Sequence, residues 1–299
     1  MSKNQSSSFI NSISRMNLSR IISGTMNWGT WGVNHSKEDM CKLILESFDS
    51  GINSFDHADI YGGYTTEVSF GDAFAETGIN REDVFFISKC GIMYPSEKLP
   101  IQTKHYDYSE DHINKSVDNS LKNLRTDYLD CLLLHRPSPL MDISIISDAV
   151  KRLIKSGKIK SFGVSNFTAN QMDMFKGKLD ILYNQINLSL THLDHMLDGT
   201  LEYMQANDIL PMAYSPLGSY FKEENVKIKK VVDKLKNKYG CSDYQILISW
   251  LLKHPSKVYP VIGTTKSDRI KNTLGSLKIE IDLIDWFELL EASVGKRVP

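Results

Sequence analysis

The chain has 299 residues, enough for one large domain or two small ones, and its 41% hydrophobic and 24% charged residues are ordinary for a globular protein. The formal net charge of -1 gives no electrostatic reason to expect nucleic acid or an anionic membrane surface as a partner. No apolar run approaches the roughly 18 residues that span a bilayer.

The N-terminal stretch and the cysteines bear on the cellular compartment of the protein. Residues 1–17 are rich in serine, and the first acidic residue is Glu38, a composition shared with transit peptides. Without an amphipathic helix or a cleavage site, we favour a polar N-terminal tail or edge strand before a domain over residues 18–299. The cysteines are scattered without a C-x-x-C pair, which indicates reduced thiols in a cytoplasmic protein and no zinc or disulfide framework.

Strand-like and helix-like segments alternate along the first half of the chain. A strand is expected at residues 20–23, followed by a helix over residues 40–48 that ends at Gly51. The second strand is expected at the start of residues 53–64, and the third at residues 84–87. Ser109 then caps a helix that carries an apolar face from Ile113 to Leu124, and a helix over residues 146–153 comes after the apolar strand 129–134.

The same alternation continues in the second half. Strands are predicted at residues 160–164, 181–185, 209–213 and 258–262. Helices are predicted from the capping box 168–171, around 197–204, over 231–239, from the capping box 242–245, from about 267, and at 283–292. Eight strands alternating with helices predict an α/β fold, and over this length a single-domain (β/α)8 TIM barrel is favoured over an open sheet. No Rossmann or P-loop glycine motif occurs.

In a barrel of this kind the active site forms where the strands end. Asp56 and Tyr61 follow the second strand, Lys89 the third and His135 the fourth. Each has a structural explanation by itself: a solvated lysine, a hydrogen-bonded histidine, a turn-capping carboxylate and a core tyrosine. Four such residues on three consecutive strand ends nevertheless indicate a catalytic group.

The sequence resembles the aldo-keto reductase superfamily, and most closely the bacterial YdhF-like oxidoreductases, over nearly the whole chain. The motifs that carry the resemblance stand in order at residues 55–62 (FDHADIYG), 88–91 (SKCG), 134–137 (LHRP), 162–167 (FGVSNF), 183–186 (YNQI), 213–218 (AYSPLG) and 262–266 (IGTTK). The family fold is the (β/α)8 barrel. The resemblance implies a soluble enzyme that reduces an aldehyde or ketone to an alcohol with NADPH.

The resemblance also implies a catalytic tetrad. Hydride transfer to a carbonyl carbon builds negative charge on the carbonyl oxygen, which must be met by a proton. Tyr61 would give that proton, and the Lys89 ammonium would lower the pKa of the phenol. Asp56 would hold Lys89 in place, and His135 would orient the substrate carbonyl.

The cofactor NADPH/NADP+ would be held by residues at the remaining strand ends. The resemblance implies that the nicotinamide is bound by Ser165, Asn166, Gln185 and Tyr214, and that Thr25 and Met26 line the cofactor near the first strand. It implies that the pyrophosphate is bound by Ser215, Leu217, Gly218, Gly263, Thr264 and Thr265. The 2′-phosphate would be bound by Arg269 and Lys266. The two cations favour NADPH over NADH.

The chain departs from the family pattern at three positions. His57 stands where many relatives have Thr, and Asn272 and Thr273 stand where relatives tend to have Glu and Asn, which affects the adenine contacts. Pro299 follows soon after the last predicted helix, so a long substrate-covering loop is not expected.

Two rival functions share parts of this pattern. One is an NADPH-binding regulatory subunit with little turnover, whose known examples bear Asn at the position of His135. The other is a phosphate-binding barrel isomerase or aldolase, which would need a Schiff-base or enolising site such as Lys89 could provide, but which gives no reason for the nicotinamide-site pattern. The substrate is a small carbonyl compound of undetermined class. Its pocket walls are expected from Trp28, Trp31, Tyr94, Tyr220 and Phe221, which follow strand ends, and the alternative for each is packing in the core. The sequence carries no signal for an oligomeric state.

Overall fold

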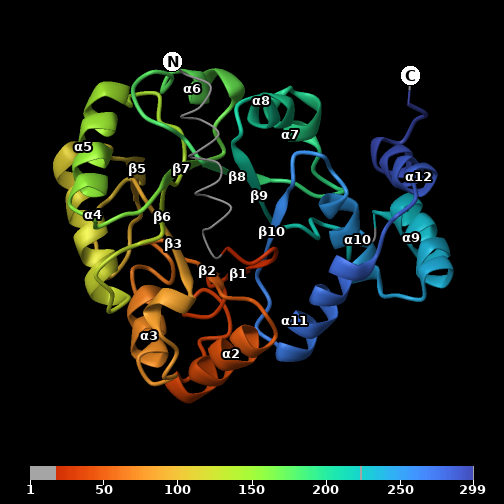
Figure 1. Ribbon diagram of the computed structural model, residues 1–299, viewed down its shortest axis with the longest axis horizontal. Coiled ribbons are helices and arrows are strands. Elements are labelled where there is room, and N and C mark those ends of the chain that lie inside the picture. The colour runs from red at the N-terminus through yellow and green to blue at the C-terminus, as the bar shows by residue number, and fades with distance from the viewer. Residues whose placement is uncertain (1–17, 223, 299) are drawn as a thin grey trace.

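The computed structural model describes residues 18–222 and 224–298, and the predicted N-terminal tail over residues 1–17 lies outside them. Eight parallel strands close into a barrel in the order β1-β10-β9-β8-β7-β6-β3-β2 (Figure 1). Their bounds are β1 Ile22–Gly24, β2 Ser54–Asp56, β3 Phe85–Cys90, β6 Cys131–Leu134, β7 Phe162–Ser165, β8 Tyr183–Asn187, β9 Leu210–Tyr214 and β10 Tyr259–Ile262. The predicted barrel and the eight predicted strand positions are confirmed.

Helices surround this barrel as an outer layer (Figure 1). They are α2 Lys37–Asp49, α3 Thr66–Phe74, α4 Glu110–Asn123, α5 Ile143–Lys155, α6 Ala169–Asp173, α7 Asp194–Leu197, α8 Thr200–Ala206, α10 Asp243–Leu252 and α11 Ser267–Leu274, with the 3-10 turns η1 Arg81–Asp83 and η2 Gly275–Lys278. The predicted caps are present, because Ser109 accepts a backbone hydrogen bond from His112, and capping boxes form at Thr168 and Ser242.

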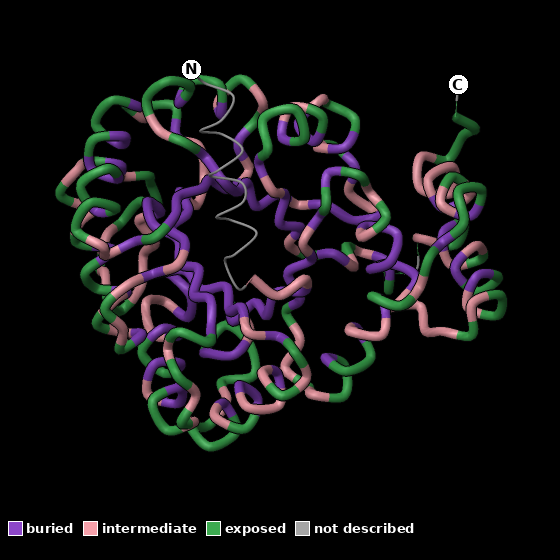
Figure 2. Tube along the Cα trace, in the orientation of Figure 1, coloured by how far each residue is buried: buried purple, intermediate pink, exposed green. Residues whose placement is uncertain are grey.

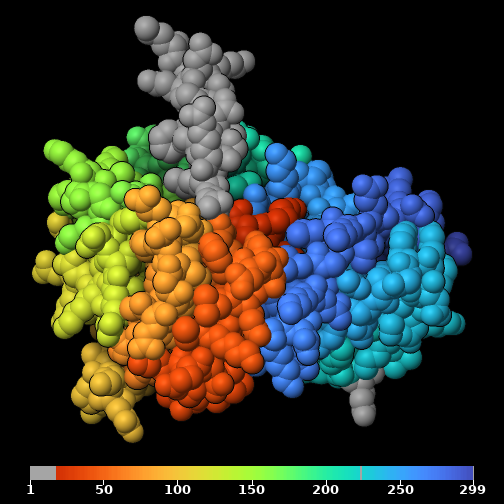
Figure 3. Space-filling model, turned by 60° about the horizontal axis from the view of Figure 1, so that its bottom comes forward, coloured from red at the N-terminus to blue at the C-terminus, as the bar shows by residue number. Residues whose placement is uncertain are grey.

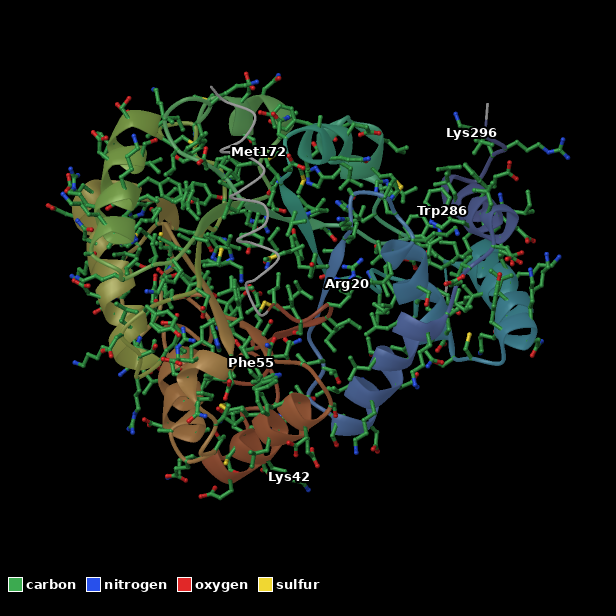
Figure 4. All side chains as sticks on the ribbon, viewed as in Figure 1. Arg20, Lys42, Phe55, Met172, Trp286 and Lys296 are labelled. Carbon is green, nitrogen blue, oxygen red and sulfur yellow. The ribbon has the colours of Figure 1, made fainter. Side chains whose placement is uncertain are left out.

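Two helices lie together outside that ring, beyond α10. These are α9 (Val226–Tyr239) and α12 (Leu283–Val294), and they are neighbours in both Figure 1 and Figure 3. Trp286 of α12, labelled in Figure 4, stacks on Trp250 of α10 with ring centroids 5.1 Å apart. Each indole N–H donates to the other residue's carbonyl oxygen, at 3.2 and 3.0 Å, so the pair fixes α12 on α10.

The sequence did not predict α3 or a two-stranded ladder. The interior Gly71 weakens the helical pattern of α3, but it permits close packing on α4, since a Cβ there would lie 2.1 Å from the carbonyl oxygen of Asn123. In the loop after β3, β4 (Ile92–Met93) pairs antiparallel with β5 (His105–Tyr106), and each strand has only two residues.

Alternation along the strands decides what faces the barrel interior. Phe85 and Ile87 of β3 and Cys131 and Leu133 of β6 belong to the interior cluster. Residues of the opposite parity pack on the helices, and Figure 2 shows the strands buried inside helices whose outer faces are exposed. Continuing the inward parity places Lys89 at the end of β3, where it pairs in register with Leu133, and His135 just after β6. The fold therefore directs these side chains to the mouth of the barrel.

Across the described part of the chain, no helix is long and apolar enough to cross a membrane.

Candidate active site

The buried side chain of Lys89 is the centre of a hydrogen-bond network at the ends of β2 and β3. Its Nζ donates to Asp56 Oδ2 at 2.8 Å, to the carbonyl oxygen of His57 at 2.8 Å and to Tyr61 Oη at 2.9 Å. All three N–H groups of the ammonium are therefore used. Gln185 on β8 donates to the other oxygen of Asp56 at 2.9 Å, so both carboxylate oxygens are held.

Burial and neighbouring charges set the protonation of this network. Burial lowers the pKa of Lys89, but Asp56 and Tyr61 outweigh it, and the pKa is raised, so the ammonium stays charged at neutral pH. Burial raises the pKa of Tyr61, and the opposing effect of Lys89 is smaller. Lys89 therefore acts in the predicted direction, since its charge lowers the pKa of Tyr61, but desolvation of the phenolate outweighs that effect. The phenol stays protonated, which is the form that gives a proton.

His135 lies beside this network as a neutral base. Its ring centroid is 6.0 Å from that of Tyr61, at an interplanar angle of 78°. Burial lowers the pKa of His135 well below 6.5, and the charges of Lys89, Arg136 and Lys104 act in the same direction. Its Nδ1 is buried and finds no hydrogen-bond partner among the described residues. A neutral imidazole keeps one N–H, which can donate to a carbonyl oxygen.

His57 faces away from the site, which explains its place next to Asp56. The strand parity that turns Asp56 inward turns His57 outward, against Phe70 and Phe86, with ring centroids at 4.3 and 5.7 Å. The hydroxyl of Thr25 lies 3.0 Å from His57 Nδ1 and donates to the carbonyl oxygen of Asp56 at 3.0 Å. His57 is thus part of the packing between the barrel and α3.

A cavity of about 840 Å³ opens at this end of the barrel. Most of the residues assigned from the sequence line it: Met26, Asp56, Tyr61, His135, Ser165, Asn166, Gln185, Tyr214, Ser215, Leu217, Gly218, Gly263, Thr264 and Arg269. Four are not part of its wall. Lys89 lies behind Asp56 and Tyr61, Thr25 is fully buried beneath β2, and Thr265 and Lys266 lie beside the wall. The cofactor roles of all the assigned residues stay predictions, and Thr25, Thr265 and Lys266 also lie outside the cavity wall.

The backbone at two strand ends is strained. Asn166 and Ser215 adopt left-handed conformations, with φ of 61° and 50°, which cost energy for residues other than glycine and cluster at ligand sites. The Tyr214 hydroxyl donates to Asn166 Oδ1 at 2.9 Å. At Gly218, a Cβ would lie 2.0 Å from Thr191 Oγ1, so the chain keeps this turn open only with glycine.

The far end of the cavity is aromatic and cationic. Arg269 lies over the ring of Tyr244 at 5.9 Å, and Phe221 packs on the same ring at 5.1 Å. Tyr244 and Ile248 are lining residues that the sequence reasoning missed, because they lie on helix α10 and follow no strand end. Thr273 also lines the cavity. A planar guanidinium beside aromatic faces suits an adenosine phosphate, so the residues present fit the predicted cofactor.

The opposite end has aromatic walls around Tyr61. Of the five predicted pocket walls, Trp31 and Tyr94 lie here, with ring centroids 5.1 Å apart, and Phe221 lies at the Arg269 end. Trp28 and Tyr220 are buried in the core instead, so the packing alternative holds for these two. Arg136 and Lys104 also line the cavity. Sequence reasoning missed both, although Arg136 directly follows His135.

Comparisons with known proteins find similar proteins over nearly the whole chain. A model described as the aldo/keto reductase family matches residues 20–292. The oxidoreductase YdhF of Escherichia coli is 37% identical over 94% of this chain and 95% of its own length. A 6-dehydroglucose reductase of Agrobacterium fabrum is 35% identical over 95% of this chain and 97% of its own. The crystal structure of the thermostable aldo-keto reductase Tm1743 with the inhibitor epalrestat superposes with a TM-score of 0.79 at 28% identity, over 91% of this chain and 94% of that one.

Proposed function

The chain belongs to the aldo/keto reductase family, as its motifs predicted, and we propose that it reduces an aldehyde or ketone to the alcohol with NADPH. The observation that carries the proposal is the Lys89 network, in which one buried ammonium holds the carboxylate of Asp56 and the hydroxyl of Tyr61, with His135 next to them in the wall of the cavity.

In this proposal each residue has a separate task. Tyr61 gives its hydroxyl proton to the carbonyl oxygen as negative charge develops there. Lys89, charged and 2.9 Å from Tyr61 Oη, stabilises the phenolate that this transfer leaves behind. Asp56 keeps the ammonium in place, and neutral His135 donates a hydrogen bond that orients the carbonyl. NADPH supplies the hydride.

The cofactor assignment rests on the two ends of the cavity. Asn166 and Tyr214 lie near Tyr61 and His135 and suit the nicotinamide end, while the backbone turn at Gly218 can approach a pyrophosphate closely. Arg269 at the far end suits the 2′-phosphate that distinguishes NADPH from NADH.

The test is steady-state oxidation of NADPH with a panel of aldehydes and ketones, using the wild type, Tyr61→Phe and Tyr106→Phe. The panel includes 6-dehydroglucose because a relative is named for reducing it. We expect Tyr61→Phe to bind NADPH normally but to lose most turnover, at least about 100-fold, as is typical for loss of a general acid. Tyr106 is an exposed tyrosine of β5, and its substitution controls for the lost hydroxyl.

Two results would contradict the proposal. If Tyr61→Phe keeps wild-type turnover, the proton donor is misassigned. If the wild type binds NADPH tightly yet oxidises none with any carbonyl compound, the regulatory alternative takes its place, although the intact tetrad with His135 argues against it.

A further inference from the structure

Two basic side chains lie in the cavity wall at the end that holds His135. Arg136 directly follows His135 after β6, and Lys104 directly precedes β5 in the loop after β3. Both lie close enough to His135 for their charges to act on its imidazole. Arg136 is half-buried, and its guanidinium lies 5.9 Å from the ring centroid of Tyr214. The two cations therefore border the space where a substrate carbonyl would meet Tyr61 and His135.

Neither cation is neutralised by an acid of the described chain. Arg136 makes one side-chain hydrogen bond, to the Tyr214 hydroxyl at 3.4 Å, and Lys104 takes part in no ion pair or side-chain hydrogen bond found among residues 18–222 and 224–298. Asp56 is the carboxylate in the cavity wall, and it is already paired with Lys89. A half-buried guanidinium ordinarily has partners, as Arg81 has in Asp130 and two carbonyl oxygens.

The cofactor does not account for these charges. The proposed sites for its phosphates lie at Gly218, Gly263 and Arg269, whereas Arg136 contacts Tyr214 beside the nicotinamide end, which carries no phosphate. Arg269 lies at Tyr244 and Arg136 at Tyr214, and the proposed phosphate sites account only for the charge of Arg269.

We propose that Arg136 and Lys104 bind an anionic group, a carboxylate or phosphate, on the carbonyl substrate. The planar guanidinium can hold two oxygens of such a group, and Lys104 adds a second positive charge. Trp31 and Tyr94 flank the body of the substrate between this group and the carbonyl at Tyr61. The inference rests on the proposed reductase function and specifies its substrate class as anionic aldehydes or ketones.

The test compares pairs of carbonyl compounds in which one member carries an anionic group and the other does not. 4-Carboxybenzaldehyde is paired with its uncharged methyl ester, and glyceraldehyde 3-phosphate is paired with glyceraldehyde, so that carboxylate and phosphate recognition are measured separately. The quantity compared is the ratio of kcat/KM for the charged and uncharged member of each pair. We expect the wild type to favour the charged member of at least one pair, mainly through a lower KM, with a preference that weakens as ionic strength rises.

Variants then locate the preference. Arg136→Gln and Lys104→Met should each lower the ratio, by about tenfold for Arg136 because a charge-assisted hydrogen bond is lost. Arg136→Lys should keep part of the preference. Lys151→Met, which removes the same charge from the exposed face of α5, should leave the ratio unchanged. Lys104 is exposed, so its variant tests the inference even where a change at Arg136 disturbs folding.

Three results would overturn the inference alone and leave the reductase proposal intact. The first is that the wild type reduces the methyl ester and glyceraldehyde as efficiently as their charged partners. The second is that Arg136→Gln and Lys104→Met lower kcat/KM equally for both members of each pair, and the third is that Lys151→Met lowers the ratio as much as they do. Failure to reduce any of the four compounds or the wider panel would overturn the proposed function as well.

Discussion

Replacing Lys89 by methionine should destabilise the protein far more than removing a surface lysine. The side chains of Lys89 and Asp56 are 0% and 3% exposed, so Lys89→Met leaves a carboxylate buried without its counter-charge. The hydroxyl of Tyr61 and the carbonyl oxygen of His57 also lose their donor. Removal of one partner from a buried ion pair costs about 3–5 kcal/mol, which is a large part of the stability of an ordinary domain.

The magnitude can be separated from a general packing effect with a second substitution. In the double variant Asp56→Asn/Lys89→Met no charge remains buried at this site, and the amide can still accept from Gln185. We expect the double variant to be more stable than Lys89→Met alone, by about 1–3 kcal/mol. Both variants should be inactive in carbonyl reduction. If the double variant is more stable than Lys89→Met and still has no turnover, the effect of the Asp56 charge on stability is separated from its role in holding Lys89 for catalysis.

Urea unfolding at pH 7, followed by fluorescence, measures these differences. The matched control is Lys158→Met, which removes the same group from an ion pair with Asp118 whose side chains are 41% and 54% exposed. That change should cost no more than about 1 kcal/mol. A loss for Lys89→Met within the range of this control would refute the reasoning, since it would mean that the buried carboxylate is neutralised or solvated without Lys89.

Two further predictions concern the cofactor and acid stability. Arg269→Ala should weaken NADPH binding by about tenfold or more in fluorescence titrations and leave NADH binding nearly unchanged. An equal loss of affinity for both cofactors would mean that Arg269 does not bind the 2′-phosphate. Lys266 lies outside the cavity wall, so Lys266→Ala should weaken NADPH binding less. Burial holds the pKa of His57 well below 6.5, so the unfolded chain takes up a proton there before the folded chain does. Stability should therefore fall as the pH drops below about 6.5, at up to about 1.4 kcal/mol per pH unit. His57→Thr should reduce the loss of unfolding free energy between pH 7.5 and pH 5.5, as measured by urea unfolding. The control is His105→Thr, which changes an exposed histidine. If His57→Thr loses as much stability as the wild type, or if His105→Thr reduces the loss equally, His57 is not the source of the pH dependence.

The barrel and the direction of its site residues were within reach of the sequence. The apolar runs that end in Lys89 and His135 are strands buried on both faces, and every second residue of such a strand shares a face. Ile87 and Leu133 face the barrel interior, so Lys89 and His135 must face it too. The same parity sends Thr25 and His57 outward, so the position of His57 in the packing layer against α3 was also within reach of the sequence.

Other features depended on contacts between distant segments. Tyr244 and Ile248 reach the cavity from helix α10, because that helix packs behind the turn after β10, and nothing local marks them. The protonation of Tyr61 is decided by a competition between burial and the Lys89 charge. A motif supplies both residues but not the depth at which they lie, so it predicts the direction of the Lys89 effect but not the net shift of the Tyr61 pKa.

Arg81 and Arg136 show how the tertiary structure separates a structural cation from one available to a ligand. Each is half-buried near the end of a loop or strand, and the sequence around neither says which acid it meets. Arg81 bonds to Asp130 and to the carbonyl oxygens of Val84 and Tyr128, which satisfies its charge inside the fold. Arg136 faces the cavity with a tyrosine hydroxyl as its side-chain contact in the described chain. A cation without an acidic partner favours binding of an anion in the cavity. Because Arg136 lies beside His135, we expect that anion to be part of the substrate.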